Sequence, residues 1–239
     1  SYENNFIKIH HGSLKEIQSD ILVKYDGMQI IHDESWELRM LLSKIKEKRL
    51  ILYKDHAKNC LFNSIFCCEK TKQGLKTSSV FSSCWQICAS YFLADAICSL
   101  NLYRPNPTHM LDMIRKFEKS QINEQISTIT QTIGLERAIP SLLERILKST
   151  IGFSDLVENN NHSKIIQQKY DLFLKNSMLS DCYFYLGYIN KENFMNFKDT
   201  IEHQSNLIHI LKVAFDIEVD SNLLEHQANL IQKSCNTIL

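Results

Sequence analysis

The sequence predicts a mainly α-helical protein, with helical bundles preceded by a small β-containing N-terminal segment. The 239 residues include only six glycines and three prolines, too few turn residues for a protein of many strands and hairpins. Long stretches therefore run without a helix breaker, and apolar residues recur in them at spacings of three and four. Alternation of apolar and polar residues, which is typical of half-buried strands, is confined to the first 33 residues.

The N-terminal segment, residues 1–33, is the first of three predicted domains. Apolar and polar residues alternate in FIKIH, residues 6–10, and in DILVKY, residues 20–25. The pair Asp26 and Gly27 that follows is a favoured sequence for a two-residue hairpin turn. We therefore expect three short strands in this segment, and the tight turn would join DILVKY to the third, MQIIHD, residues 28–33.

Helices are expected in the rest of the chain. Residues 34–73 contain no glycine or proline, and Asp33 or Ser35 can cap the start of this region. The next helix, over about 77–101, is apolar on most sides and is expected at the centre of the bundle. The stretch YRPNPTH, residues 103–109, ends that helix because proline cannot continue the hydrogen-bond ladder.

Three polar residues further along the chain are candidate N-caps: Thr108, Asn190 and Asp220. The polar string VENNNHS, residues 157–163, marks a loop and the clearest domain boundary. The remaining helices are predicted over 110–120, two short segments within 121–150, 163–186, 191–217 and 221–238. The second and third predicted domains are residues 34–152 and 163–239.

Charge and hydropathy argue against two classes of partner. The 27 basic residues balance the 27 acidic ones, so no global field directs the chain to nucleic acid or to an anionic membrane. The longest apolar run is about half a dozen residues, well short of the roughly 20 that a membrane span needs. The first residues lack the apolar region of a secretory signal, and we expect a cytoplasmic protein without membrane contact.

The eight cysteines lie among apolar, helix-forming residues. In a cytoplasmic chain this placement indicates reduced thiols buried in the core rather than disulfides. Cys84 and Cys88 are one helical turn apart, but a structural zinc site needs four converging ligands, usually in two close pairs. No metal site is expected from the cysteines and histidines.

The stretch HGSLKEIQSDILV contains a Gly-Ser turn followed by an acidic residue. At Gly12, Ser13, Ser19 and Asp20 it resembles nucleotidyltransferases of the polymerase-β type, which bind a nucleotide triphosphate and magnesium. The resemblance implies that Gly12 and Ser13 bind nucleotide, that Asp20 and Asp33 are catalytic carboxylates, and that Mg²⁺ is the cofactor of an active enzyme. Leu22 stands where the family has its second metal carboxylate, so the implied transferase centre is degenerate or incomplete.

Residues 55–117 carry a second resemblance. A helix begins with Ala-Lys, a polar connection contains a glycine, a helix of small and aromatic residues follows (ASYFLADAICSL), and a histidine heads the next helix. This order is similar to a HEPN domain, the helical bundle found beside or fused to minimal nucleotidyltransferases. The resemblance makes residues 34–152 the HEPN-like bundle and residues 1–33 the nucleotidyltransferase-like segment, followed by a helical unit over 163–239.

Many HEPN proteins are metal-independent ribonucleases, with an arginine followed after four to six residues by a histidine. The arginine holds the phosphate and the histidine does the acid-base chemistry. Arg104 and His109 fit that count. They also fit a plain connection in which Tyr103 packs, Thr108 caps a helix and His109 hydrogen-bonds across the bundle.

Three functions therefore stay open. The first is a nucleotidyltransferase-related helical module that binds a nucleotide or another substrate. The second is a HEPN-type ribonuclease that cleaves RNA with Arg104 and His109. The third is a non-enzymatic helical scaffold that dimerises. We expect a homo-oligomer or a paired partner protein.

Overall fold

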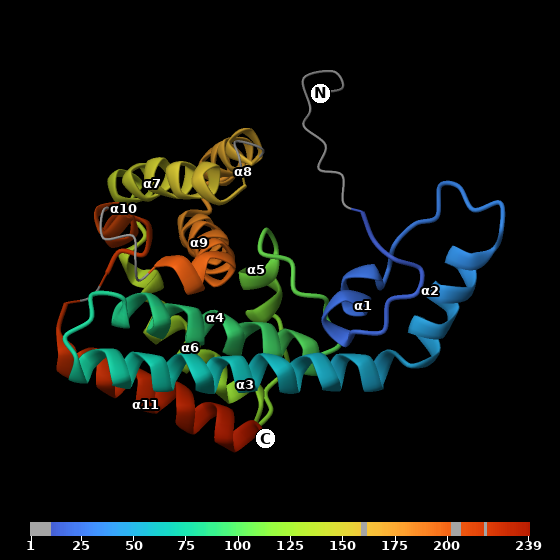
Figure 1. Cartoon of the computed structure of the whole chain (residues 1–239), viewed down its shortest axis with the longest axis horizontal. Coiled ribbons are helices and arrows are strands. Elements are labelled where there is room, and N and C mark those ends of the chain that lie inside the picture. Colours follow the sequence, from blue (N-terminus) through green and yellow to red (C-terminus); the bar gives the residue numbers. More distant parts are fainter. Residues whose placement is uncertain (1–10, 159–161, 202–206, 218) are drawn as a thin grey trace.

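The computed structural model describes residues 11–158, 162–201, 207–217 and 219–239. They form α-helices, two short 3-10 segments and connecting loops (Figure 1). No strand occurs in these described ranges, so the prediction of a mainly α protein is confirmed for them. The first predicted strand, residues 6–10, lies outside the described residues.

The helices follow one another in chain order along the described residues. They are α1 (Ser19–Tyr25), α2 (Glu37–Glu47), α3 (Arg49–Lys76), α4 (Ser82–Leu100), α5 (Met110–Ile114), α6 (Ile126–Ile133), α7 (Pro140–Glu158), α8 (Ser163–Lys175), α9 (Leu179–Ile201), α10 (Ile208–Ala214) and α11 (Ser221–Ile238). The 3-10 segments are η1 (Asn123–Gln125) and η2 (Leu135–Arg137).

Helix α4 is the centre of the bundle, as predicted for residues 77–101. Of its 19 residues, 17 are buried, and small side chains such as serine, alanine and cysteine let neighbouring helices approach it from several sides. Helices α3 and α11 pack along one side of α4, while α7, α8, α9 and α10 stack on the other (Figure 1). One apolar core joins residues from Cys60 to Cys235, and the division at 152–163 stays a prediction.

The predicted strands over residues 20–25 and 28–33 are wrong. Residues 28–33 form a loop, and residues 20–25 form helix α1. Leu22 and Val23 are its buried residues, and a strand would turn these neighbours to opposite faces. The Asp-Gly pair does make a turn, but not a hairpin. Asp26 (φ −60°, ψ 132°) and Gly27 (φ 75°) have type II dihedrals, and this turn ends α1.

The predicted helix cap at Asp220 is confirmed. The Asp220 side chain accepts hydrogen bonds from the amides of Asn222 and Leu223 at the start of α11. Asp33 is not the N-cap residue of α2, which is Trp36, but its carboxylate accepts from the amides of Leu38 at 3.4 Å and Arg39 at 2.9 Å in the first turn. Both carboxylates satisfy amides that a helix leaves unpaired at its N-terminus.

Two other predicted caps are wrong. Helix α5 begins after His109 rather than Thr108. Asn190 lies inside α9, where its amide donates to Thr150 Oγ1 at 2.9 Å and to the carbonyl of Ala214 at 2.7 Å. It therefore joins three helices of the bundle instead of starting one.

The eight cysteines are buried free thiols, as predicted. Burial raises the pKa of Cys88 well above its usual value, so this thiol stays protonated at neutral pH. No helix among the described residues is long and apolar enough to cross a membrane.

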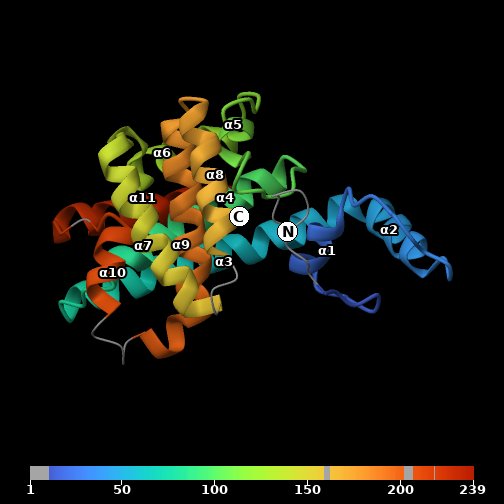
Figure 2. The same ribbon diagram turned by 90° about the horizontal axis from the view of Figure 1, so that it is seen from above.

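Helix α2 and its flanking segments form an arm, which we define as residues 27–51. It projects from one end of the bundle in both views (Figures 1 and 2). Helix α2 packs against α1 and the start of α3, and Ile45 is its only residue classed as buried. The arm therefore packs on α1 and α3. The contacts that hold α1 against α3 determine the direction in which the arm projects.

Candidate functional site

Asp20 lies in a polar cluster between α1 and α3. Its Oδ1 accepts hydrogen bonds from His56 Nδ1 at 2.6 Å and from Asn59 Nδ2 at 3.1 Å. The bond from His56 lowers the pKa of Asp20, and it outweighs the opposing effect of burial. The carboxylate is therefore charged at neutral pH, and because it can only accept, the His56 proton lies on Nδ1.

Cys60 lies next to this pair, so the site holds the three residue types of a thiol-based catalytic triad. The geometry does not fit that chemistry. The Cys60 Sγ is 3.9 Å from His56 Nδ1 and 3.7 Å from Nε2, almost equidistant, and so it does not lie along the Nε2 lone pair. Burial also raises the pKa of Cys60 well above its usual value. We read this thiol as part of the core.

A second polar contact joins the end of α1 to the start of α3. Asp26 Oδ2 accepts from Arg49 Nε and from the Tyr53 hydroxyl, both at 2.8 Å. Burial alone would raise the pKa of Asp26, but the bonds from Arg49 and Tyr53 lower it overall. Burial and the nearby carboxylate raise the pKa of Tyr53 to about 12, so its hydroxyl remains a donor.

Arg104 belongs to the same attachment of α1. Its Nη1 donates to the backbone carbonyls of Lys24 at 3.1 Å and Asp26 at 3.3 Å. Such carbonyls at the C-terminal end of a helix lack intrahelical partners. His109 is exposed at the start of α5, and no hydrogen bond joins its side chain to Arg104 within the described part of the chain. Arg104 therefore caps the C-terminal end of α1, whereas the His109 side chain faces solvent.

The nucleotide-binding candidates lie before α1 in an exposed connection. Ser13 Oγ accepts from the amide of Lys15 at 3.1 Å. Gly12 packs against Tyr25, and a Cβ on this glycine would lie 2.2 Å from the Tyr25 hydroxyl oxygen. Asp33 bonds to the first turn of α2, as described above. No three histidine, cysteine or acidic side chains converge on a possible metal position in the described residues.

Sequence reasoning missed the residues on α3 that receive α1. Arg49, Tyr53, His56 and Asn59 recur at spacings of three and four, so a helical wheel of α3 would have shown a polar stripe beside the buried face. A helical wheel could not have identified their partners on α1, because those residues were expected to form a strand.

A buried ion pair joins α4 to α9. Lys191 Nζ lies 2.9 Å from Asp95 Oδ2, with side chains 7% and 5% exposed. Tyr188 donates to Asp95 Oδ1 at 2.8 Å, and the Lys191 ammonium lies over the rings of Phe92 and Tyr188, 4.3 and 4.5 Å from their centres. Burial would lower the pKa of Lys191, but Asp95 raises it overall. The charges are satisfied by each other, which indicates a structural role.

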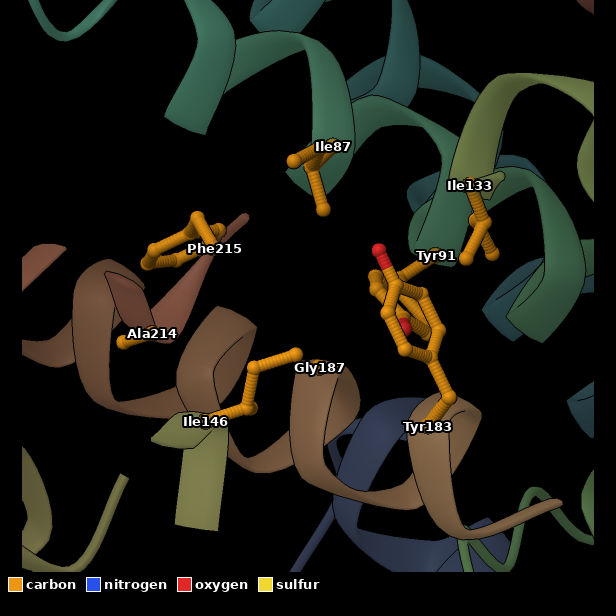
Figure 3. Close-up of a pocket in the computed structure, with 8 residues that line it drawn as sticks. All are labelled: Ile87, Tyr91, Ile133, Ile146, Tyr183, Gly187, Ala214 and Phe215. Atoms are coloured by element: carbon orange, nitrogen blue, oxygen red, sulfur yellow. The ribbon is translucent and has the colours of Figure 1, made fainter. Parts of the chain in front are cut away.

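The cavity shown in Figure 3 lies inside the bundle, between α4 and α9, with α6, α7 and α10 completing its wall. Its volume is about 10 Å³, room for about one water molecule and none for a nucleotide. Position 187 in its wall has no room for a side chain, because a Cβ on Gly187 would lie 2.1 Å from the Tyr91 hydroxyl oxygen. The Tyr91 hydroxyl donates a hydrogen bond to the carbonyl of Phe184 at 3.1 Å.

A surface groove of about 450 Å³ runs between the end of α3 and the start of α11. Lysines and glutamates both line it, among them Lys72, Lys76, Glu69 and Glu225. Lys72 and Glu69 both bond to Gln232 of α11. These polar groups therefore hold the two helices together rather than presenting one charge to a ligand.

The clearest surface feature is apolar and lies on the arm and the residues before it. The described residues include 19 large apolar side chains classed as exposed, and eight of them fall within residues 14–51. They are Leu14, Ile17, Met28, Ile31, Trp36, Met40, Leu50 and Ile51. Ile31 is fully exposed, Trp36 is 62% exposed and Met40 is 54% exposed. Exposed apolar groups concentrated in one region mark surfaces that bind other molecules.

Comparisons of the chain with family models, with curated proteins and with solved structures give no match in any of the three searches.

Proposed function

We propose that this chain is a non-enzymatic helical module that binds a partner protein through its arm, residues 27–51. The observation that carries the proposal is the set of exposed apolar side chains on an element that projects from the bundle (Figure 2). Burying one such side chain contributes about 1.5–3 kcal/mol. A partner that covered several of them would be held mainly by this term.

The chemistry of the arm suits protein binding. Trp36, Met40 and Arg39 belong to residue types that are enriched at protein interfaces. The Arg39 guanidinium carbon lies 4.4 Å from the centre of the Trp36 ring, which holds the indole in place before a partner arrives. A side chain that is already ordered loses less conformational entropy on binding.

The bundle and the α1 contacts give the arm a rigid base. Asp20, Asp26 and Arg104 tie α1 to the bundle, and α1 in turn supports α2. Two of the residues that suggested catalysis, Asp20 and Arg104, thus support the docking element. The proposal assigns them no chemical step.

Nucleotide transfer and RNA cleavage stay predictions from the resemblances. A transferase would need carboxylates that converge on a metal, whereas Asp20 and Asp33 bond to different helices, α3 and α2. A ribonuclease would need Arg104 free to hold a phosphate, whereas its guanidinium is bonded to carbonyls of α1. The geometry therefore favours the module without catalysis.

Site-specific photo-crosslinking tests the docking surface. A photoreactive amino acid would replace Met40, and the matched control would replace Leu172, an apolar side chain of α8 that is 48% exposed. In cells, we expect a covalent adduct with a defined protein, either a different protein or a second copy of this chain, from position 40 and not from position 172. Equal labelling at both positions, or none at position 40, would overturn the proposal.

A further inference from the structure

We infer that the partner is a second copy of this chain, with the two α2 helices paired antiparallel about a twofold axis. The inference rests on the proposed function, since it takes the arm as the docking surface. It adds the identity of the partner and the register of the contact.

Charge is segregated along the arm. Residues 27–37 contain Asp33, Glu34 and Glu37 and no lysine or arginine, whereas residues 44–48 contain three lysines and one glutamate. Asp33 bonds to the first turn of α2, and Glu34 and Glu37 are exposed beside it. None of the three lysines makes an ion pair in the described part of the chain, and all three are exposed. The arm thus has an acidic end and a basic end.

The spacing places these charges on one face with an apolar centre. Glu37, Met40, Lys44 and Lys48 follow one another at intervals of three, four and four residues, so their side chains share a face of the helix. A twofold axis near Met40 would place Glu37 of one copy opposite Lys44 of the other, and the reverse pair would form at the same time. The two Met40 side chains would meet at the axis.

A second copy fits this pattern better than a partner of uniform charge. An anionic membrane or a nucleic acid would be attracted to the lysine end and repelled by the glutamates at the other end. An inverted copy matches both ends, and a twofold contact uses the same patch on both subunits. In antiparallel packing, the positive end of each helix dipole also lies beside the negative end of the other, which is favourable.

The exposed apolar side chains around α2 extend the contact. Ile31 and Trp36 lie at the acidic end, and Leu50 and Ile51 lie just beyond the basic end at the start of α3. In the antiparallel arrangement, the apolar groups at one end of an arm face those at the other end of its partner. The charges then set the register, and the apolar groups supply the buried core of the interface.

Sedimentation equilibrium of the purified chain and its variants tests this arrangement. We expect the unmodified chain to dimerise and Met40→Asp to weaken the dimer at least tenfold. Leu172→Asp, the matched exposed position on α8, should leave it unchanged. Glu37→Lys and Lys44→Glu should each weaken self-association severalfold, because each places like charges opposite one another.

An equimolar mixture of Glu37→Lys and Lys44→Glu should form a heterodimer as tight as the original dimer, since both contacts then pair opposite charges. A substitution that only loosened α2 would not be rescued by mixing, and circular dichroism of each variant checks its helix content. A mixture that stays monomeric overturns the inferred register.

A monomeric unmodified chain would overturn the second-copy inference altogether. If position 40 still crosslinks to a different protein in that case, the proposed docking function stands and only the partner is wrong. If the chain is monomeric and position 40 crosslinks to nothing, both proposals fail.

Discussion

At the scale of single residues, two of the side chains that suggested catalysis, Asp20 and Arg104, attach α1 to the bundle. Asp20 accepts from His56 and Asn59, and Arg104 donates to carbonyls at the end of α1. Aspartate and arginine side chains have the same hydrogen-bonding chemistry whether they hold a helix or a substrate. Their partners distinguish the two uses, and here the partners are groups of the chain itself.

Replacing Asp26 by alanine should destabilise the fold. The change leaves Arg49 and the hydroxyl of the buried Tyr53 without their shared acceptor. We expect the free energy of unfolding to fall by about 1–3 kcal/mol, the usual cost of a buried polar group left unpaired. Urea denaturation measures it. Glu34→Ala, at an exposed position of the arm, is the control and should change stability by about 0.5 kcal/mol or less.

Acid should loosen the attachment of α1. The pKa values of Asp20 and Asp26 are lower in the folded chain than their ordinary value of 3.8. Their contribution to stability is therefore complete above that value and is lost as pH falls through the lower folded pKa values. We expect the amides of α1 to lose protection against hydrogen exchange, relative to their intrinsic exchange rates at each pH, below about pH 4. The double variant Asp20→Asn/Asp26→Asn should show a flatter pH dependence, and an unchanged one would contradict this assignment.

Magnesium-dependent nucleotide binding provides the direct test of the transferase hypothesis. Both oxygens of Asp33 accept from amides in the first turn of α2, and Asp20 Oδ1 is shared by two donors. We expect titration calorimetry with ATP to give the same result with and without Mg²⁺, both for this chain and for Asp20→Asn. Binding that required both the metal and Asp20 would instead establish a transferase-type pocket.

At the scale of helices and loops, chain reversals occur at residues that sequence rules do not mark. Ser78, Leu102, Ser177 and Asp216 have left-handed φ angles between 45° and 58°. Each is followed by an amide that bonds back to a carbonyl five residues earlier, the hydrogen bond of a Schellman motif. The predicted helix over 163–186 is therefore divided at Ser177, because a left-handed turn closes α8 without glycine or proline.

The buried pair between α4 and α9 gives a prediction at this scale. Lys191→Met leaves the carboxylate of Asp95 buried and short of its counter-charge, so the free energy of unfolding should fall by about 3–5 kcal/mol. Adding Asp95→Asn removes that charge and should recover part of the loss. Denaturant unfolding of the two single variants and the double variant measures the coupling, and strictly additive losses would contradict it.

At the scale of the whole molecule, a well-packed bundle carries a projecting arm. The core is continuous from Cys60 to Cys235, whereas only one residue of α2 is buried. Exposed apolar side chains are unfavourable in water, and the bundle does not bury those of the arm. The contrast between bundle and arm is the basis for both proposals about the arm, and the crosslinking and sedimentation experiments test them.

The sequence by itself determined the local and statistical features of this protein. Few glycines and prolines and an apolar spacing of three and four predicted helices, the central place of α4, the buried cysteines and the cap at Asp220. Each of these depends on helix propensity, backbone capping or burial of a single residue type, which neighbouring residues largely decide.

Only the tertiary structure decided that residues 20–25 are a helix, that Asp20 meets His56 and that Arg104 caps α1. The alternation in residues 20–25 is compatible with a strand, and packing against α3 selects the helix instead. Contacts such as the one between Asp20 and His56 join residues 36 positions apart, and no local pattern records them. They depend on how helices pack, which is a property of the whole chain.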